Sequence, residues 1–359
     1  MTSTSGEAPE HDHATAGPTS RPARVVVLSG GVGGARFLQG LLHHHCCVGG
    51  PPPEVTVVTN TADDLWVHGL KVCPDLDTVM YTLGAGIDEE RGWGRRDETW
   101  SVRAELEAYG AEPTWFGLGD RDVATHLVRT QMLEAGYPLS AVTTALCERW
   151  QPGVTLLPMT DDRVETHVAI DDAESPSGRR VVHFQEYWVR LRAEVPARAV
   201  VPVGIEKSRP APGVLEAISA ADVVLLPPSN PVVSIGTILG VPGIRETLRA
   251  TAAPVVGLSP IVAGDHVRGM AAQLLRSIGV ETTASAVAAH YGARSDGGVV
   301  DGWLVDERDA DQVETVESGG IRCGAVPLMM TDLDATAAMV RAAYALADQL
   351  ASARPGATG

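Results

Sequence analysis

Residues 25–36 read VVVLSGGVGGAR, and this stretch decides the fold. A β-branched run at 25–28 leads into four glycines within the five positions 30–34, and a helix-compatible segment follows at 35–44. The pattern predicts a strand, a glycine loop and a helix in succession. A second β-branched run follows at 55–59, and two strands joined by a helix form a βαβ unit whose strands are parallel.

Short apolar runs and helical segments continue to alternate along the chain. Runs typical of buried strands occur at 154–157, 200–203, 223–226 and 255–258. Apolar spacing predicts one helix that begins near Asp265 as its N-cap and another over 333–347. We therefore expect an α/β protein with a Rossmann-like three-layer αβα fold, a mainly parallel sheet and a largely helical insertion.

The chain is predicted to form one α/β domain with flexible ends. Residues 1–24 lack apolar periodicity and are expected to be a disordered tail. The domain spans 25–352, with insertions at about 86–150 and 161–198, and residues 353–359 are expected to be a flexible C-terminus. The insertion at 161–198 begins with the alternation of a hairpin, which suits either a lid or a subunit contact.

Composition excludes several classes of partner. A formal charge of −17, without a basic stripe, argues against nucleic acid. The chain has no export signal at its start and no apolar run of about 18 residues, so we expect no membrane partner and a cytoplasmic location. Five cysteines without a CxxC pair suit a reducing compartment.

The glycine loop is a candidate phosphate site. A dinucleotide fingerprint would need glycine where Arg36 stands, and no Gly-Lys-Ser/Thr closes the loop as in a P-loop. The free N–H groups at 30–34 and the dipole of the following helix still favour a phosphate or diphosphate. The alternative is a tight turn without a ligand.

Four carboxylates follow the second predicted strand, namely Asp63, Asp64, Asp75 and Asp77. Ligands of open α/β sheets bind at the carboxyl ends of strands, where Asp63 and Asp64 are expected. Because clustered carboxylates repel one another, Mg²⁺ between them and a ligand diphosphate would relieve the repulsion. Alternatively, one or two of the four cap turns or helices.

Three further signals are weaker. Arg121 precedes a predicted helix and either binds a carboxylate or phosphate or pairs with a neighbouring aspartate. Ser229 and Asn230 follow a predicted strand, in a loop suited to a base or a sugar. The run at 43–47, HHHCC, lacks metal-ligand spacing and is expected to be a solvated helix end.

Taken in order, the motifs of this chain resemble those of the CofD family of 2-phospho-L-lactate transferases. The resemblance spans nearly all of the chain after the tail. Within the family, the chain most resembles the actinobacterial phosphoenolpyruvate transferases of coenzyme F-420 biosynthesis. It rests on SGGVGGAR at 29–36, NTADD at 60–64, PDLDT at 74–78, GDRD at 119–122 with His126, LPMTDD at 157–162, HFQEY at 183–187 and SNP at 229–231.

The resemblance implies an Mg²⁺-dependent transferase. Such an enzyme moves the phosphoenolpyruvyl or 2-phospholactyl group from a guanosine diphospho-donor to the deazaflavin Fo. It releases GMP and forms dehydro coenzyme F-420-0 or coenzyme F-420-0. The family expectation is a homodimer.

The resemblance also suggests roles for individual residues. By this resemblance the catalytic residues are Asp64, Asp75 and Asp77, and the metal ligands are Asp63, Asp64 and Asp75. The residues expected to bind Fo are Asp77, Thr78 and Arg121. The residues expected to bind the donor nucleotide are Gly30, Gly31, Val32, Gly33, Gly34, Ser229 and Asn230.

Two rival functions remain open. One is a non-catalytic regulatory protein that binds nucleotide sugars, like the related gluconeogenesis factors. The PDLDT and GDRD motifs favour the transferase over it. The other is a dehydrogenase, which Arg36 disfavours.

Overall fold

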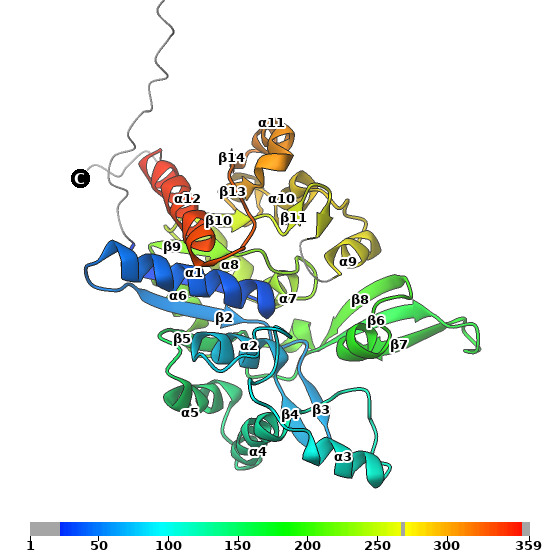
Figure 1. The fold of residues 1–359 in the computed structure, drawn as a ribbon. Helices are drawn as coiled ribbons and strands as arrows, with labels where there is room; N and C mark the ends of the chain where they lie inside the picture. Colours follow the sequence, from blue (N-terminus) through cyan, green and yellow to red (C-terminus); the bar gives the residue numbers. More distant parts are fainter. Residues whose placement is uncertain (1–21, 267–269, 354–359) are drawn as a thin grey trace, which may run out of the picture.

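The computed structural model describes residues 22–266 and 270–353. A seven-stranded parallel sheet with the order β14-β13-β10-β9-β1-β2-β5 forms its centre (Figure 1). Its strands in chain order are β1 (Arg24–Ser29), β2 (Glu54–Thr59), β5 (Thr155–Pro158), β9 (Val223–Leu226), β10 (Val255–Leu258), β13 (Gly302–Val305) and β14 (Arg322–Ala325). The predicted α/β class with a mainly parallel sheet is confirmed.

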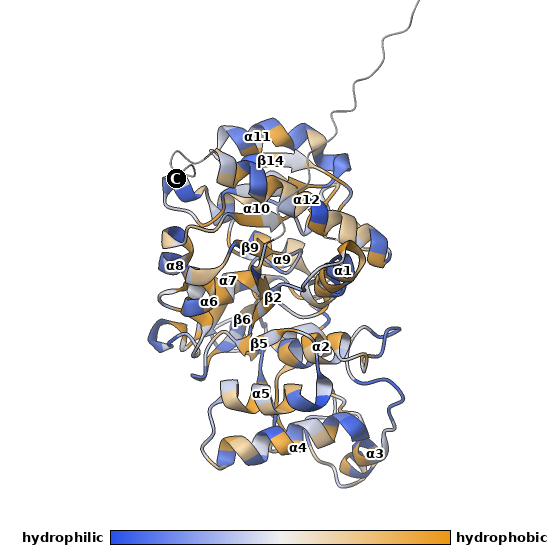
Figure 2. Ribbon diagram, turned by 90° about the vertical axis from the view of Figure 1, so that its left-hand side faces the viewer, coloured by the Kyte–Doolittle hydropathy of each residue, from blue (hydrophilic) through white to orange (hydrophobic). Residues whose placement is uncertain are grey.

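Helices cover both faces of this sheet, which gives three layers (Figure 2). One face packs against α1 (Val32–Val48), α2 (Pro74–Leu83), α5 (Leu139–Trp150) and α12 (Leu333–Ser352). The other packs against α6 (Val214–Ala220), α7 (Ile235–Gly240), α8 (Ile244–Ala250), α10 (Ala284–Tyr291) and α11 (Val313–Ser318). Because successive side chains of a strand point to opposite faces, Val25 and Val27 enter the first core and Val26 and Leu28 the second.

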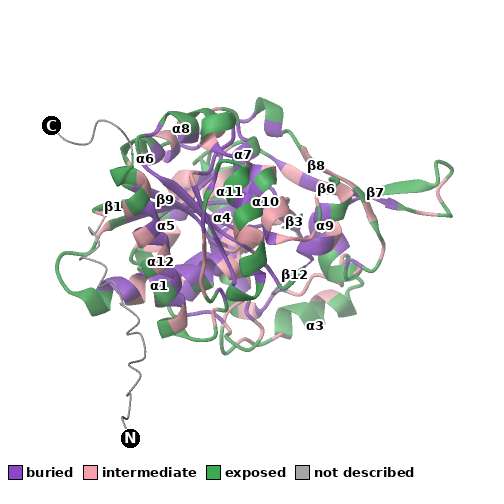
Figure 3. Cartoon of the chain, turned by 90° about the horizontal axis from the view of Figure 1, so that it is seen from above, coloured by how far each residue is buried: buried purple, intermediate pink, exposed green. Residues whose placement is uncertain are grey.

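Two additions lie beside the main sheet. Between β2 and β5 the chain forms a hairpin of β3 (Leu65–Val67) and β4 (Leu70–Val72), and beyond α2 the helices α3 (Ser101–Ala108) and α4 (Asp120–Glu134). A second, antiparallel sheet has the order β7-β6-β8, with β6 (Glu165–Asp171), β7 (Arg179–His183) and β8 (Ala197–Val203). Figure 3 shows its hairpin projecting from the body, with buried residues concentrated in the main sheet.

The expectation that 200–203 is a buried strand is wrong. These residues belong to β8, whose partner is β6 rather than a strand of the main sheet. Only one side of this small sheet has a core, so the side chains of Val201 and Val203 point outward and are half exposed. An apolar run alone does not reveal whether a strand is covered on one face or on both.

The predicted helix start at Asp265 is also wrong. Asp265 lies in β12 (Asp265–His266), which pairs with β11 (Ile261–Val262) through a tight turn whose residues Ala263 and Gly264 have positive φ. The helix is α9 (Ala271–Ser277), and residues 267–269, within the predicted helix, lie outside the described residues.

The chain ends agree only in part with the expected boundaries. Arg24, expected to close the tail, is the first residue of β1, and its N–H donates to Asp222 Oδ2 at 2.9 Å. The rest of the predicted tail up to residue 21, and residues 354–359, lie outside the described residues. Within the described chain, every helix is too short or too polar to cross a bilayer.

Candidate functional site

The candidate site lies at the carboxyl ends of β1, β2 and β9. Strand β1 pairs with β2, the next strand along the chain, on one side and with β9 on the other. The order of strands therefore reverses between β1 and β9, and open α/β sheets bind ligands at such a switch point. The loops that flank it are the glycine loop after β1 and the loop 227–230 after β9.

The glycine loop packs tightly against the loop 227–230 and the start of α2. The N–H of Gly30 donates to Ser229 Oγ at 3.3 Å. A Cβ on Gly31 would lie 2.5 Å from Asp75 Oδ1, and one on Gly33 would overlap the carbonyl oxygen of Pro228. Close packing with the protein itself thus explains why glycine is needed at these positions.

The first turn of α1 leaves its N–H groups open. Gly31 is the N-cap, and no side chain among the residues that the structure describes caps the helix. Val32 and Gly33 are partly exposed, whereas Gly34 is buried. Uncapped N–H groups at the start of a 17-residue helix attract an anion. The geometry of this turn therefore suits a phosphate.

Ser229 and Asn230 lie at the switch point, but Asn230 already has partners. Its Oδ1 accepts from the N–H groups of Val232 and Val233, at 2.9 and 3.2 Å, and so holds the turn into α7. Ser229 is buried against the glycine loop. The two residues shape the wall of the site between β1 and β9.

Asn60 connects the end of β2 to the carboxylates. Its Nδ2 donates to Asp75 Oδ2 at 3.0 Å. Its Oδ1 accepts from the N–H of Ala62 at 3.0 Å and from Thr237 Oγ1 at 2.7 Å. Asn60 thereby joins β2, the first turn of α2 and α7, although the sequence suggested no role for it.

Asp63, Asp64 and Asp75 lie close enough to influence one another. Burial, reinforced by the charge of Asp75, raises the pKa of Asp63 well above its usual value. Burial raises the pKa of Asp64, while the nearby Lys71 lowers it. Burial and the charge of Asp64 raise the pKa of Asp75 to about 7, against the hydrogen bond from Asn60. These three predicted site residues are brought together.

Lys71, at the middle of β4, is the cation nearest to Asp64 among the described ion pairs. Its Nζ lies 3.3 Å from Asp64 Oδ2. Asp64 is 1% exposed, and neither of its oxygens has a well-directed hydrogen-bond donor in the described chain. This ion pair was not predicted from the sequence, since the hairpin that forms it was not expected.

Asp77 occupies a separate, fully paired position. It forms a two-pronged ion pair with the buried Arg129 of α4, in which Nη1 lies 3.1 Å from Oδ2. His126 lies between Asp77 and Asp122, with its ring nitrogens 3.7 and 3.4 Å from their carboxylates. Tyr81 donates to Asp122 at 2.7 Å. Asp77 therefore anchors α2 to α4, and Thr78 beside it is buried.

Arg121 does not join this network. Its guanidinium is about half exposed, with Nη1 3.8 Å from Asp97. The arginine that reaches the predicted acidic residues is Arg129, two turns further along α4. Spacing within the helix distinguishes them, since Asp122, His126 and Arg129 recur at steps of four and three and so share one face.

His183 links the small sheet to the carboxylates. Its Nδ1 accepts from the N–H of Gln185 at 3.1 Å, so Nε2 carries the proton and donates to the carbonyl oxygen of Asp64 at 3.2 Å. Burial lowers the pKa of His183, which keeps the ring neutral at pH 7. The His183 ring thus fixes the backbone at Asp64 rather than supplying charge.

The donor chemistry here suits a hard divalent cation. Asp63 Oδ1 and both oxygens of Asp64 lack a well-directed hydrogen-bond donor in the described chain. No three His, Cys, Asp or Glu side chains within 22–266 and 270–353 converge on one point. Mg²⁺ commonly takes one or two carboxylates together with substrate phosphates and water, and Asp63 and Asp64 could provide such carboxylates.

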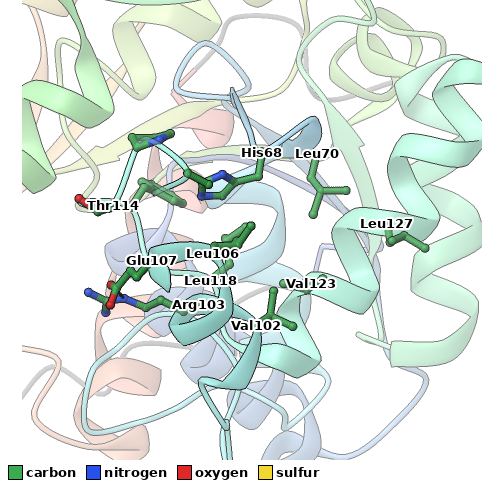
Figure 4. A pocket seen from close by; sticks show the side chains of 13 residues that line it. His68, Leu70, Val102, Arg103, Leu106, Glu107, Thr114, Leu118, Val123 and Leu127 are labelled. Atoms are coloured by element: carbon green, nitrogen blue, oxygen red, sulfur yellow. Dashed lines mark hydrogen bonds and ion pairs between the residues drawn. The ribbon is translucent and has the colours of Figure 1, made fainter. Parts of the chain in front are cut away.

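Two cavities adjoin this region. One of about 420 Å³ opens beside the first turn of α1 and is lined in part by Val32, Arg36 and Thr82. The other, of about 230 Å³, lies among the β3–β4 hairpin, α3 and α4 (Figure 4). Its wall is mostly apolar, with Leu70 and Leu106 facing the space, and it contains none of the predicted site residues.

The expectation of a solvated helix end at 43–47 is wrong for His44 and His45, which are buried, whereas Cys46 and Cys47 are exposed. This run lies in the last turns of α1, where His45 Nε2 is 2.9 Å from the hydroxyl of Tyr344 and His43 Nε2 is 2.9 Å from Asp334. Both contacts join α1 to α12.

Comparison with known proteins gives one family and one fold. The family described as "2-phospho-L-lactate transferase CofD" matches residues 25–335. A phosphoenolpyruvate transferase of Streptomyces griseus subsp. griseus is 66% identical over 328 residues, covering 91% of this chain and 99% of that protein. One of Mycolicibacterium smegmatis is 59% identical over 328 residues, covering 90% and 98%.

A solved structure shares the fold at lower sequence identity. It is a crystal structure of a member of the UPF0052 family from Bacillus halodurans, with a TM-score of 0.58 and 18% identity. The match covers 90% of this chain and 99% of that one. At this identity the likeness shows the fold alone.

Proposed function

Because the chain belongs to the CofD family of 2-phospho-L-lactate transferases, we propose that it transfers a phosphoenolpyruvyl group from a guanosine diphospho-donor to the deazaflavin Fo. The reaction releases GMP and forms dehydro coenzyme F-420-0. The 2-phospholactyl donor, which would give coenzyme F-420-0, is the alternative. The names of relatives at 58–67% identity favour the enolpyruvyl donor.

One observation carries the proposal: the glycine loop packs directly on Asp75. The open N–H groups of α1 and the carboxylates of Asp63, Asp64 and Asp75 therefore belong to one site. A donor diphosphate held at α1 would have its reacting phosphorus beside a carboxylate. Positioning of this kind is the main requirement of phosphoryl transfer.

In the proposed reaction, the terminal ribityl hydroxyl of Fo attacks the phosphorus that bears the three-carbon acid. A new P–O bond forms to Fo, and the bond from this phosphorus to the oxygen of GMP breaks. The hydroxyl proton passes to Asp75, because a carboxylate with a pKa of about 7 is suited to accept a proton near neutral pH.

The other residues hold the partners in place. Amides at the start of α1 bind the donor diphosphate, and the Ser229–Asn230 wall borders its guanosine part. Asp63 and Asp64 would hold Mg²⁺, which when bound neutralises charge on the phosphates. We assign Asp77 a positioning role in place of base, because Arg129 occupies both of its oxygens.

The test is mass spectrometry of Fo incubated with Mg²⁺ and each guanosine diphospho-donor in a separate tube. We expect product and GMP from the enolpyruvyl donor, at least a hundredfold less with Asp75→Asn, and undiminished product with the exposed control Asp311→Asn. Product from the lactyl donor alone would reassign the donor. Absence of GMP from both tubes would refute the transferase and favour a regulatory nucleotide-sugar-binding protein.

We further propose a cytoplasmic homodimer. The five cysteines are free thiols, as a reducing compartment favours. Val181, Val201 and Val203 are each at least 50% exposed on the open face of the β7-β6-β8 sheet, which supports a contact between subunits there.

A further inference from the structure

Lysine is rare in this chain, and one of its lysines lies in the candidate site. Of the 28 basic residues only Lys71 and Lys207 are lysines, and the rest are arginines. Lys207 is exposed at the end of a short helix. The side chain of Lys71 is only 13% exposed. The candidate site therefore contains a compact ammonium on a flexible side chain, whereas nearly all other basic side chains of the chain are planar guanidinium groups.

The backbone of Lys71 is fixed, and its side chain is the part that can move. Its N–H donates to Thr130 Oγ1 at 2.9 Å, and its carbonyl oxygen accepts from Arg129 at 3.3 Å. Arg129 is itself committed to Asp77. Within the described chain, the Lys71 ammonium forms one ion pair, with Asp64 at 3.3 Å.

Asp64 has two competing uses. As a buried carboxylate it needs a counter-charge, and Lys71 supplies one. Its oxygens also lack well-directed hydrogen bonds, which leaves them available to a divalent cation. An ammonium and a divalent cation on the same carboxylate repel each other strongly, so the two uses exclude one another.

We propose that Lys71 is a displaceable counter-ion, which neutralises Asp64 before ligands bind and turns its ammonium to a donor phosphate oxygen when a divalent cation takes Asp64. The nature of the phosphate ligand rests on the proposed function. The competition for Asp64 depends only on the charges and distances around it. Lysine suits this exchange because it binds as a point charge and needs no planar partner.

The first test measures Mn²⁺ binding by calorimetry without substrates, for the native protein and for Lys71→Met, Lys71→Arg and Lys207→Met. We expect Lys71→Met to bind Mn²⁺ about tenfold more tightly, because the competing charge is gone. Lys71→Arg and Lys207→Met should stay within about threefold of the native protein. Unchanged or weaker binding by a folded Lys71→Met, or no Mn²⁺ binding by the native protein, would overturn the proposal.

The Lys71→Met substitution should have the opposite effect on nucleotide binding, weakening it where it strengthens Mn²⁺ binding. With saturating Mn²⁺, Lys71→Met is expected to bind GDP about tenfold more weakly than the native protein, because one phosphate contact is lost. Lys207→Met should bind GDP as the native protein does. A Lys71→Met variant with native GDP affinity would contradict the second half of the exchange.

A further measurement uses the unaltered protein and so does not depend on the folding of any variant. An amine-reactive reagent labels both lysines, and mass spectrometry gives the ratio of Lys71 to Lys207, which is the internal reference. We expect this ratio to rise at least threefold when Mn²⁺ is added and to fall when GDP is added as well, as the ammonium leaves Asp64 and then binds phosphate. A constant ratio in all three states would refute the exchange.

These outcomes are separable from those of the transfer assay. Tighter Mn²⁺ binding by Lys71→Met together with no GMP release would preserve the exchange and reject the transferase. GMP release with Mn²⁺ binding indifferent to Lys71 would do the reverse.

Discussion

Arg121 and Arg129 lie on the same helix, but only Arg129 is buried among charges. Removing one partner of a buried ion pair leaves the other charge uncompensated, at a cost of roughly 3–5 kcal/mol. We therefore expect Arg129→Ala to lose about that much free energy of unfolding in urea, whereas Arg121→Ala should change it by less than about 0.5 kcal/mol. Equal effects of the two substitutions would mean that the Asp77 pair is unimportant.

The raised pKa of Asp75 makes the free energy of unfolding depend on pH. Its pKa is raised from 3.8 to about 7, so the folded protein binds a proton more tightly than the unfolded chain. This contribution to stability is complete below about pH 4 and is lost as the pH rises through 7.

The matching variant is Asp75→Asn, which lacks the titrating group. Without metal, from pH 4.5 to pH 8 the native protein should lose roughly 1–4 kcal/mol of unfolding free energy relative to this variant. Urea unfolding in EDTA at the two pH values measures the change, and Asp311→Asn should behave as the native protein does. A native-to-variant difference that is the same at both pH values would show that Asp75 titrates normally.

At the scale of elements, the glycine loop links β1 to the loop after β9. A Cβ at position 33 would overlap the carbonyl oxygen of Pro228, a backbone atom that cannot rotate away. We expect Gly33→Ala to destabilise the protein by about 1–3 kcal/mol and to weaken GDP binding at least tenfold, because the loops at the switch point must separate.

Gly324→Ala is the control for this substitution. The nearest atom to its added Cβ is a side-chain carbon of Leu304 at 3.5 Å, which is ordinary contact. Thermal unfolding and GDP calorimetry on both variants make the comparison. Native GDP affinity in Gly33→Ala would place the nucleotide elsewhere.

The elements that could be predicted from the sequence are those buried on both faces or clearly amphipathic. β1, β2, β9 and β10 are rich in apolar and β-branched residues, and α12 has an apolar stripe. The β3–β4 hairpin has three residues per strand and was missed, although His68 and Gly69 form its positive-φ turn. β13 and β14 were missed as well, because β13 begins with glycine and β14, which reads RCGA, contains arginine and glycine and forms no apolar run.

The candidate site could likewise be predicted only in part. Motifs along the chain indicated Asp63, Asp64 and Asp75, which do lie together. The counter-charges did not follow from local patterns, because Arg129 meets Asp77 across 52 positions of sequence. Lys71 meets Asp64 only because the missed hairpin turns the chain back. Pairing partners depend on the tertiary fold, which a single sequence does not display.

For the whole molecule, the formal charge of −17 governs association. Two copies repel each other, and salt screens this repulsion. If the exposed valines of the small sheet form the dimer contact, light scattering should show at least threefold tighter association at 200 mM than at 20 mM salt.

A pair of variants tests the location of that contact. Val201→Glu should give monomers at both salt concentrations, whereas Val48→Glu, at a valine 58% exposed at the end of α1, should not. A dimer that persists in Val201→Glu would place the contact on another surface.

The two halves of the site differ greatly in the length of chain needed to build them. The half with the carboxylates comes from one continuous stretch, Asn60 to Asp75, whereas Gly30 and Ser229 meet across 199 positions. A ribosome must therefore synthesise well over half of the protein before the nucleotide wall can close, and closing so long a loop is a slow step in folding. Nucleotide affinity should return late in refolding, so its recovery reports when the glycine loop and the loop after β9 have come into contact.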